Sequence, residues 1–310
     1  MNELQPINQI RLFGLENFFL ELSQFHKKGN FSNKLLLSGQ KGLGKSTLAY
    51  HFINYVLSKN ENYEYDIDNF EINPKNHSFK TVSNKSNTNF ILIDITPEKK
   101  NIEINQIREL ITSLNKSSFN NKPRFVLIDN IEFLNNNAIN ALLKILEEPS
   151  YNVHFILINN NKKILPTLLS RCINFKISLT NKQSINIVDK LLDKNFSKRI
   201  NNDLLNYYST PGKIYNLVRF GETYNVDLEN INLKNFLKLI IKDNYYKKDN
   251  FMKYMVFDLI ELYFNKINMS FSDNIYNKYS YFLKRISDTR NFNLDNESLF
   301  IEFNEEILNG

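Results

Sequence analysis

The first half of the chain alternates short apolar runs with stretches in which apolar residues recur every three or four positions. Four of the runs have strand length: Leu35–Leu37, Phe90–Ile95, Phe125–Ile128 and Phe155–Ile158. The periodic stretches between them predict amphipathic helices over about 46–57, 104–114 and 139–146. Strands that alternate with helices are typical of a parallel sheet covered by helices on both faces. The pattern therefore predicts an α/β module.

The pattern changes after about Ser178, where strand-like runs give way to helical stripes separated by turns rich in Asn and Lys. A small helical unit ends near Thr210–Gly212, and a second all-helical stretch follows. Its apolar stripes predict core packing between helices by Phe236, Leu237, Ile240, Met255, Leu259 and Leu262. We therefore predict three domains: the α/β module over 1–178, a helical lid over 179–221 and an all-α domain over 222–310.

A glycine-rich segment directly follows the first predicted strand and opens a helix. Gly39–Ser46 satisfies the pattern G-x-x-x-x-G-K-[ST] of the phosphate-binding loop, or P-loop. Glycine lets the backbone wrap closely around phosphate oxygens, and the helix N-terminus adds a positive dipole end. We expect Lys45 to bridge the β- and γ-phosphates and the Ser46 hydroxyl to bind Mg²⁺. The expected ligand is ATP or ADP with Mg²⁺, and its expected contacts are Gly39, Gln40, Lys41, Gly42, Leu43, Gly44, Lys45, Ser46 and Thr47.

A P-loop protein also needs a carboxylate at the end of a neighbouring strand to hold the metal ion. Asp129 ends the third strand, so Ser46 and Asp129 are the expected magnesium ligands. Hydrolysing members of this class usually place a Glu next, to polarise the attacking water, whereas here Asn130 follows. An amide cannot act as a general base, and Glu132 lies two residues further on. Nucleotide binding without efficient turnover is therefore the favoured interpretation.

Two later blocks narrow the class of P-loop protein. Asn136–Pro149, and Leu165–Cys172 with its Ser-Arg-Cys sequence, resemble the corresponding segments of bacterial clamp-loader subunits, which are AAA+ proteins. The resemblance implies that Arg171 reaches as an arginine finger into the ATP site of a neighbouring subunit. There its guanidinium would neutralise charge that develops on the transferring phosphoryl group. The AAA+ resemblance also implies a polar sensor of the γ-phosphate after the fourth strand, at Asn159 or the residue after it.

Two clamp-loader subunit types carry the Ser-Arg-Cys motif, the gamma or tau motor and delta-prime. This sequence is more similar to delta-prime, because Asn130 follows Asp129, no long tail is present, and Thr210–Lys213 resembles the delta-prime end of the lid. Lys213 stands near the place where the motor would carry an arginine that senses the γ-phosphate. The resemblance implies a hetero-oligomeric ring with gamma/tau and delta subunits, held together through a collar domain over 222–310. That ring would load the sliding clamp onto primed DNA.

Composition sets limits without deciding the function. A formal charge of +6 fits a protein that works near nucleic acid, but the cationic residues are spread along the whole chain. The single cysteine, Cys172, cannot form an internal disulfide. Both subunit types often carry a four-cysteine zinc module after the P-loop helix, but the corresponding stretch 60–89 has no cysteine, so no zinc is expected. A cytoplasmic protein without a membrane partner is expected, because neither a secretory pattern nor a membrane-spanning run is present.

Three other interpretations stay open. The first is an autonomous AAA+ DNA-dependent ATPase or motor, the second is a small-molecule kinase, and the third is an assembly scaffold with a vestigial P-loop. His51 and His154 lack the spacing of metal ligands and are expected to pack or pair locally. Cys172 has no recognisable histidine partner and is also expected to pack.

Overall fold

The computed structural model describes residues 4–29, 31–96, 99–116, 120–147, 152–192, 199–205, 209–267, 273–292 and 294–309. The chain divides into two compact units. The first comprises Met1–Leu191 with Thr210–Lys213, and the second comprises Leu192–Ser209 with Ile214–Gly310. Within the described residues, no helix is long and apolar enough to cross a membrane.

The first unit is built on a parallel sheet, to which the described residues contribute five strands. These are β1 Lys34–Ser38, β2 Phe90–Ile93, β3 Arg124–Ile128, β4 Val153–Asn159 and β5 Ile173–Lys176. They lie in the order β2-β3-β4-β1-β5, and every neighbouring pair is parallel. The four predicted strands are confirmed. The fifth was not predicted, because its short run exposes most of its side chains.

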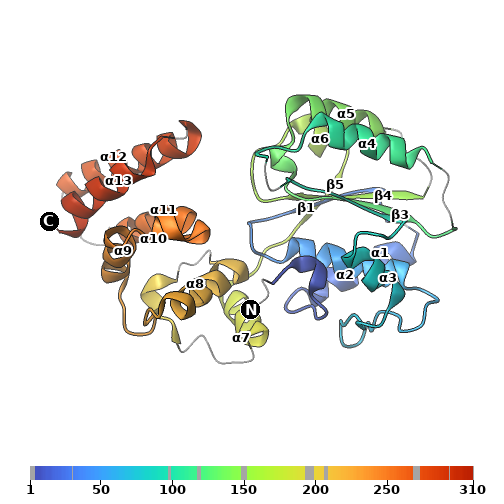
Figure 1. Ribbon diagram of the computed structural model, residues 1–310, viewed down its shortest axis with the longest axis horizontal. Coiled ribbons are helices and arrows are strands. Elements are labelled where there is room, and N and C mark those ends of the chain that lie inside the picture. The colour runs from blue at the N-terminus through green and yellow to red at the C-terminus, as the bar shows by residue number, and fades with distance from the viewer. Residues whose placement is uncertain are drawn as a thin grey trace. The chain divides into compact units, whose positions relative to one another are not determined.

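Helices cover both faces of this sheet (Figure 1). One face packs against α1 Glu16–Lys27, α2 Lys45–Leu57 and α3 His77–Ser83, and the other against α4 Ile104–Leu114, α5 Asn136–Glu147 and α6 Pro166–Leu169. Successive strand residues point to opposite faces, so Leu35 and Leu37 join the first cluster while Leu36 joins the second. The predicted helices are confirmed, with α4 matching its predicted bounds. A further helix of this unit, α7, spans Asn181–Leu191.

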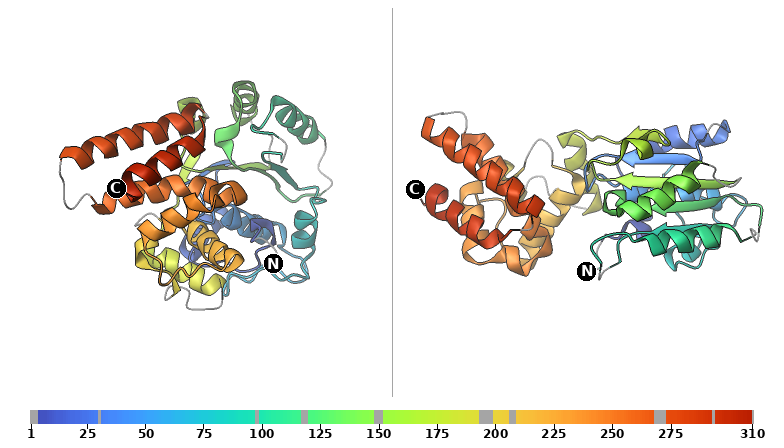
Figure 2. Two further views of the ribbon diagram at one scale, coloured as in Figure 1. Left: turned by 60° about the vertical axis from the view of Figure 1, so that its left-hand side comes forward. Right: turned by 90° about the horizontal axis from the view of Figure 1, so that it is seen from above.

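The second unit is helical throughout its described part, as predicted. Its helices are α8 Pro211–Tyr224, whose first residues belong to the first unit, α9 Leu233–Lys242, α10 Tyr245–Lys248, α11 Asn250–Ile267, α12 Asp273–Phe292 and α13 Asn296–Phe303 (Figure 2). A 3₁₀ helix, η4 Asn202–Leu204, and a π-helix, η5 Asn304–Leu308, also belong to it. The stripe residues predicted to form a core are all buried, which confirms that interpretation. The three-domain division itself stays a prediction.

The Asn-rich segment that follows α2 is folded into the first unit. Glu61 organises it: one carboxylate oxygen pairs with Lys122 Nζ at 2.5 Å and accepts the Ser78 hydroxyl at 2.7 Å. The fully buried Asn76 caps α3 and donates to the other Glu61 oxygen at 3.1 Å. Asn76 Oδ1 also accepts from Asn54 Nδ2 of α2 at 3.1 Å, so hydrogen bonds among side chains hold this loop against α2.

Candidate nucleotide-binding site

The P-loop connects β1 to α2 and depends on glycine at several positions. Gly39, Gly42 and Gly44 have φ angles of 151°, 89° and 83°, a region that residues with a side chain rarely adopt. A Cβ on Gly42 would lie 2.5 Å from Thr210 Oγ1, and one on Gly39 would lie 2.5 Å from a backbone oxygen. The loop therefore forms a backbone cradle with no room for side chains at these points.

A segment far along the sequence closes one side of the cradle. The Thr210 hydroxyl donates a hydrogen bond to the Lys41 carbonyl at 2.9 Å, and the Gly212 amide donates to the Gly42 carbonyl at 2.9 Å. Thr210 is fully buried by this contact. We call Thr210–Gly212 the clasp. Its contact with the P-loop was not predicted, because no local pattern reports a pairing over 169 residues.

Lys45 lies within the cradle. Its side chain is buried, and Nζ donates to the carbonyl oxygens of Gly39 at 2.9 Å and Gln40 at 2.6 Å. Burial lowers the pKa of the ammonium group to about 8, although the negative charge of Asp129 opposes the shift. A buried cation held only by neutral carbonyls is poised to exchange them for phosphate oxygens, which carry full charge.

Ser46 and Asp129, the two predicted magnesium ligands, lie together. The Ser46 hydroxyl donates to Asp129 Oδ2 at 2.6 Å. Burial raises the pKa of the Asp129 carboxyl, the Ser46 hydrogen bond opposes this, and the charge of Asp94 raises the pKa further. Hydroxyl and carboxylate oxygens are hard ligands of the kind that Mg²⁺ prefers, so these two side chains fit a magnesium–nucleotide complex.

A hydrogen-bonded chain of polar side chains crosses the carboxyl ends of β2, β3 and β4. Asn130, which has a left-handed backbone with φ of 56°, donates from Nδ2 to Asp94 Oδ1 at 2.9 Å. Its own Oδ1 accepts from Asn160 Nδ2 at 2.8 Å, and Asn160 also donates to Glu132 Oε1 at 2.9 Å. Asn130 is therefore bonded directly to Asp94 and, through Asn160, to Glu132. We call this set the polar chain.

Asn159 and Asp94 differ from what the sequence indicated. Asn159 is buried, and its amide group bonds to the backbone of Lys162 at 2.9 and 3.2 Å. It is Asn160 that joins the polar chain, while the sensor role of either residue stays a prediction. Asp94 was missed, although it follows β2 as Asp129 follows β3 and the same reasoning would have found it.

Arg171 lies on the side of the sheet where the strands begin, opposite to the side where the P-loop lies. It comes just before β5, which runs parallel to β1 with Leu35 beside Ile173, so it lies near the amino ends of these strands. The P-loop follows the carboxyl end of β1, roughly 13 Å away at the usual rise per residue. The guanidinium pairs with Glu147 Oε1 at 2.5 Å and donates to the Thr167 carbonyl at 2.8 Å. The fold therefore does not bring Arg171 to the P-loop of its own chain.

The remaining candidates pack as predicted. His51 is fully buried with Nδ1 3.0 Å from the Tyr65 hydroxyl, and His154 stacks on Phe125. Burial lowers the pKa of both imidazoles to about 4. Cys172 packs against the second core cluster, and burial raises the pKa of its thiol to about 11. Pro149, the last residue of the block Asn136–Pro149, lies outside the described residues.

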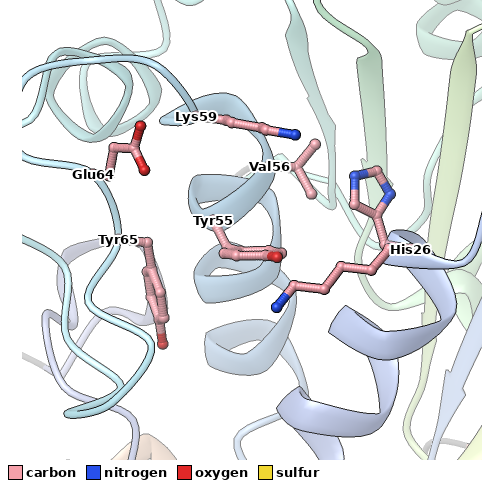
Figure 3. A pocket seen from close by; sticks show the side chains of 7 residues that line it. His26, Tyr55, Val56, Lys59, Glu64 and Tyr65 are labelled. Atoms are coloured by element: carbon pink, nitrogen blue, oxygen red, sulfur yellow. The ribbon is translucent and has the colours of Figure 1, made fainter.

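The described residues of the first unit line at least two pockets. The larger, of about 340 Å³, lies where the side chains of His26, Tyr55, Lys59 and Tyr65 surround a common space (Figure 3). It lies at the carboxyl end of α2, roughly 20 Å of helix from the P-loop, and is separate from the candidate site. The smaller, of about 140 Å³, lies beside Gly14 and is lined by residues of α7.

Comparison with known proteins identifies the family. The family described as DNA polymerase III, delta subunit matches residues 14–181, which hold the P-loop, the polar chain and Arg171. The chain belongs to this family. With the observed strand order and the P-loop after β1, this confirms the predicted AAA+ module and the predicted clamp-loader subunit family.

The named relatives include two subunit types. DNA polymerase III subunit gamma of Buchnera aphidicola subsp. Schizaphis graminum is 27% identical over 242 residues, which cover 76% of this chain and 64% of the relative. Subunit delta′ of the same organism is 25% identical over 264 residues, covering 80% and 76%. A solved gamma subunit-related protein from Thermotoga maritima covers 90% of this chain and 96% of its own, with 18% identity and a TM-score of 0.49. The chain spans less than two thirds of the gamma relative's length.

Proposed function

We propose that the chain is the delta-prime-type subunit of a DNA polymerase III clamp loader. It binds a magnesium nucleotide in its own P-loop and presents Arg171 to the ATP site of a neighbouring subunit. One observation carries the proposal: the P-loop lies at the carboxyl ends of the strands, and Arg171 lies near the amino ends of the same strands. A subunit arranged in this way has one edge that receives a nucleotide and another that can complete the site of a neighbour.

The nucleotide part of the proposal rests on the fit of the cradle. Gly39–Thr47 would surround the phosphates with backbone amides, Lys45 would pair with them, and Ser46 and Asp129 would hold Mg²⁺. When bound, Mg²⁺ neutralises phosphate charge. The small pocket beside Gly14 gives room for the base, because the adjoining Leu15 contacts the P-loop at Gly44.

The proposed role of Arg171 as an arginine finger rests on the exposure of its ion pair and on the geometry of its guanidinium group. Arg171 has only 31% of its side chain exposed, but its carboxylate partner Glu147 is more than half exposed. An ion pair with so exposed a partner holds the guanidinium weakly, so a neighbour's phosphate can compete for it. The planar fork of arginine suits the equatorial oxygens of a transferring phosphoryl group.

The proposed partners follow from the relatives, which are named DNA polymerase III subunits gamma, tau and delta′. We infer a hetero-oligomeric ring with gamma/tau and delta subunits in the cytoplasm, with primed DNA and the sliding clamp engaged by the whole complex. The helical residues 222–310 are the proposed collar. Lys213, which immediately follows the clasp, replaces the arginine expected of a motor subunit.

One observation favours a second candidate function. The P-loop, Lys45, Ser46 and Asp129 are all present and mutually positioned, as an autonomous AAA+ DNA-dependent ATPase would require. The delta-prime proposal is preferred because an amide, Asn130, follows Asp129 and is bonded on both sides.

The test compares DNA- and clamp-stimulated ATPase of gamma/tau and delta subunits with and without this chain. The clamp-loader proposal expects the rate to rise far beyond what the chain hydrolyses alone. If the chain by itself turns over ATP rapidly with DNA and leaves the partners' rate unchanged, the autonomous motor is correct instead.

A further inference from the structure

The amide at position 130 is bonded to a carboxylate from the adjacent strand. Asp94 follows β2, and its Oδ1 accepts hydrogen bonds from Asn130 Nδ2 at 2.9 Å and from the Ile95 amide at 2.7 Å. Asp94 is half-buried, and its charge raises the pKa of Asp129. A carboxylate is therefore present beside the place where a water-activating group is expected, but it comes from β2 instead of β3.

The other nearby carboxylate is held differently. Glu132 Oε1 accepts from the Asn160 side chain at 2.9 Å, and Oε2 accepts from the Asn160 backbone amide at 3.3 Å. Both Glu132 oxygens therefore take part in bonds to one residue at the end of β4. Asp94, by contrast, takes both of its side-chain bonds on Oδ1 among the described residues, which leaves Oδ2 as the acceptor that can face a water molecule.

We propose that Asp94 supplies the carboxylate that positions the attacking water, with Asn130 as its positioning partner, so that the carboxylate comes from the end of β2 and the amide from the end of β3. The proposal rests on the proposed function, because it requires ATP in the P-loop. It gives this chain a slow hydrolysis of its own, with the carboxylate displaced from the end of β3 to the end of β2.

The step is balanced without a further reactant. A water oxygen forms a bond to the γ-phosphorus while the bond from that phosphorus to the bridging oxygen breaks, and ADP leaves. The water gives one proton to the Asp94 carboxylate, which releases it to solvent after inorganic phosphate departs. Asn130 donates an Nδ2 hydrogen bond to Asp94 during the whole reaction and holds the carboxylate in its orientation toward the water.

The experiment uses the full-length chain and two readouts. Fluorescent ATP and ADP analogues report nucleotide affinity, and release of labelled phosphate with protein in excess reports hydrolysis of bound ATP. Asp94→Asn is expected to lower the hydrolysis rate about 100-fold or more, with nucleotide affinity unchanged within about threefold. Asp68→Asn, the same change at an exposed position of the first unit, is the matched control and should alter neither readout.

Removal of the amide tests the positioning role of Asn130. Asn130→Ala removes the hydrogen bond to Asp94 and leaves the Asp94 carboxylate in place, so hydrolysis should fall at least tenfold while nucleotide affinity stays within about threefold. Asn130→Gln keeps an amide donor and should retain more of the rate than Asn130→Ala. Equal hydrolysis by Asn130→Ala and the unsubstituted chain would show that the amide does not position Asp94.

Several results would overturn the inference. They are hydrolysis by Asp94→Asn within twofold of the unsubstituted chain, loss of hydrolysis in Glu132→Gln but not in Asp94→Asn, or tight ATP binding with no phosphate released by the unsubstituted chain. Absence of nucleotide binding in that chain would instead contradict the proposed function. If Asp94→Asn does not fold, Asn130→Ala replaces it, with an expected loss of at least tenfold in rate and affinity retained.

Discussion

In the sheet of the first unit, the carboxyl ends of the strands form one edge and their amino ends form the other. These carboxyl and amino edges are built in opposite ways. At the carboxyl edge, Lys45 is buried at 3% exposure, Ser46 and Asp129 are bonded to each other, and the clasp covers one side. At the amino edge, Arg171 is held by one side-chain partner, Glu147, which is 54% exposed. The groups at the carboxyl edge are buried and bonded to one another, whereas the arginine at the amino edge is paired with an exposed carboxylate.

Under the proposed function, this difference would let one fold serve two ATP sites. A buried lysine held by neutral carbonyls gains on meeting a phosphate, and a guanidinium held by an exposed carboxylate loses little on leaving it. Changes at one edge should therefore leave the other intact.

The largest effect is expected at the amino edge. Arg171→Ala should reduce ATP hydrolysis at the neighbouring site that it serves by about a thousandfold, because the charge on the transferring phosphoryl group is no longer neutralised. ATPase of the reconstituted complex, with each motor subunit's own P-loop inactivated in turn, measures that site. Arg108→Ala removes an exposed arginine of α4 and is the control. A normal rate at every site in the Arg171→Ala complex would show that the finger assignment is wrong.

The next effect is expected at the carboxyl edge. Lys45→Ala should weaken nucleotide binding by this chain about 30- to 100-fold, because a charge-assisted hydrogen bond to phosphate is lost. Titration with a fluorescent ADP analogue measures it, and Lys80→Ala on the exposed part of α3 is the matched control. Assembly with gamma/tau and delta should be unaffected. Unchanged affinity in Lys45→Ala would support the vestigial-loop interpretation.

A pH series should report the charge of the buried Lys45 side chain. The pKa of Lys45 is about 8 without nucleotide, so above pH 8 the ammonium must regain a proton to pair with phosphate. Nucleotide affinity should then fall by up to about tenfold per pH unit. Stability of the nucleotide-free chain should rise between pH 8 and 10.5, because there the folded state binds fewer protons than the unfolded state. Parallel titrations of binding and unfolding check the opposite signs, and two curves that fall together would contradict this assignment.

The smallest effect concerns the clasp. Thr210→Val keeps the shape of the side chain but removes the hydrogen bond to the Lys41 carbonyl, so the P-loop is less firmly held. Nucleotide affinity should fall by about twofold to fivefold, in line with one neutral hydrogen bond. Calorimetric titration measures this, and Thr210→Ser, which keeps the hydroxyl, should bind as the unsubstituted chain does. A larger loss in Thr210→Ser than in Thr210→Val would mean that shape matters more than the bond.

Sequence reasoning was strongest where the information is local. The P-loop pattern and the apolar runs predicted β1, α2 and the meeting of Ser46 with Asp129, because each depends on residues close to a strand end. Strand β5 was missed because Ile173–Lys176 is short and mostly exposed, which leaves no apolar run to detect.

Contacts between distant segments could not be predicted in the same way. The side-chain bond between Asp94 and Asn130 depends on β2 lying beside β3, and the clasp depends on Gly212 reaching Gly42. Neither contact produces a periodic pattern in a single sequence, because its two residues lie far apart along the chain. The sequence also could not show which of Asn159 and Asn160 joins the polar chain. The Asn159 side chain bonds instead to the Lys162 backbone in the loop after β4.

The clasp also bears on when the cradle comes into existence during synthesis. Thr210 bonds to a P-loop carbonyl 169 residues earlier, so the loop leaves the ribosome long before its cover does. At roughly 5–20 residues per second the interval is on the order of 10–30 s. During that time a nascent chain carries an uncovered P-loop, and only a chain synthesised past Gly212, about two thirds of the 310 residues, can form the clasp.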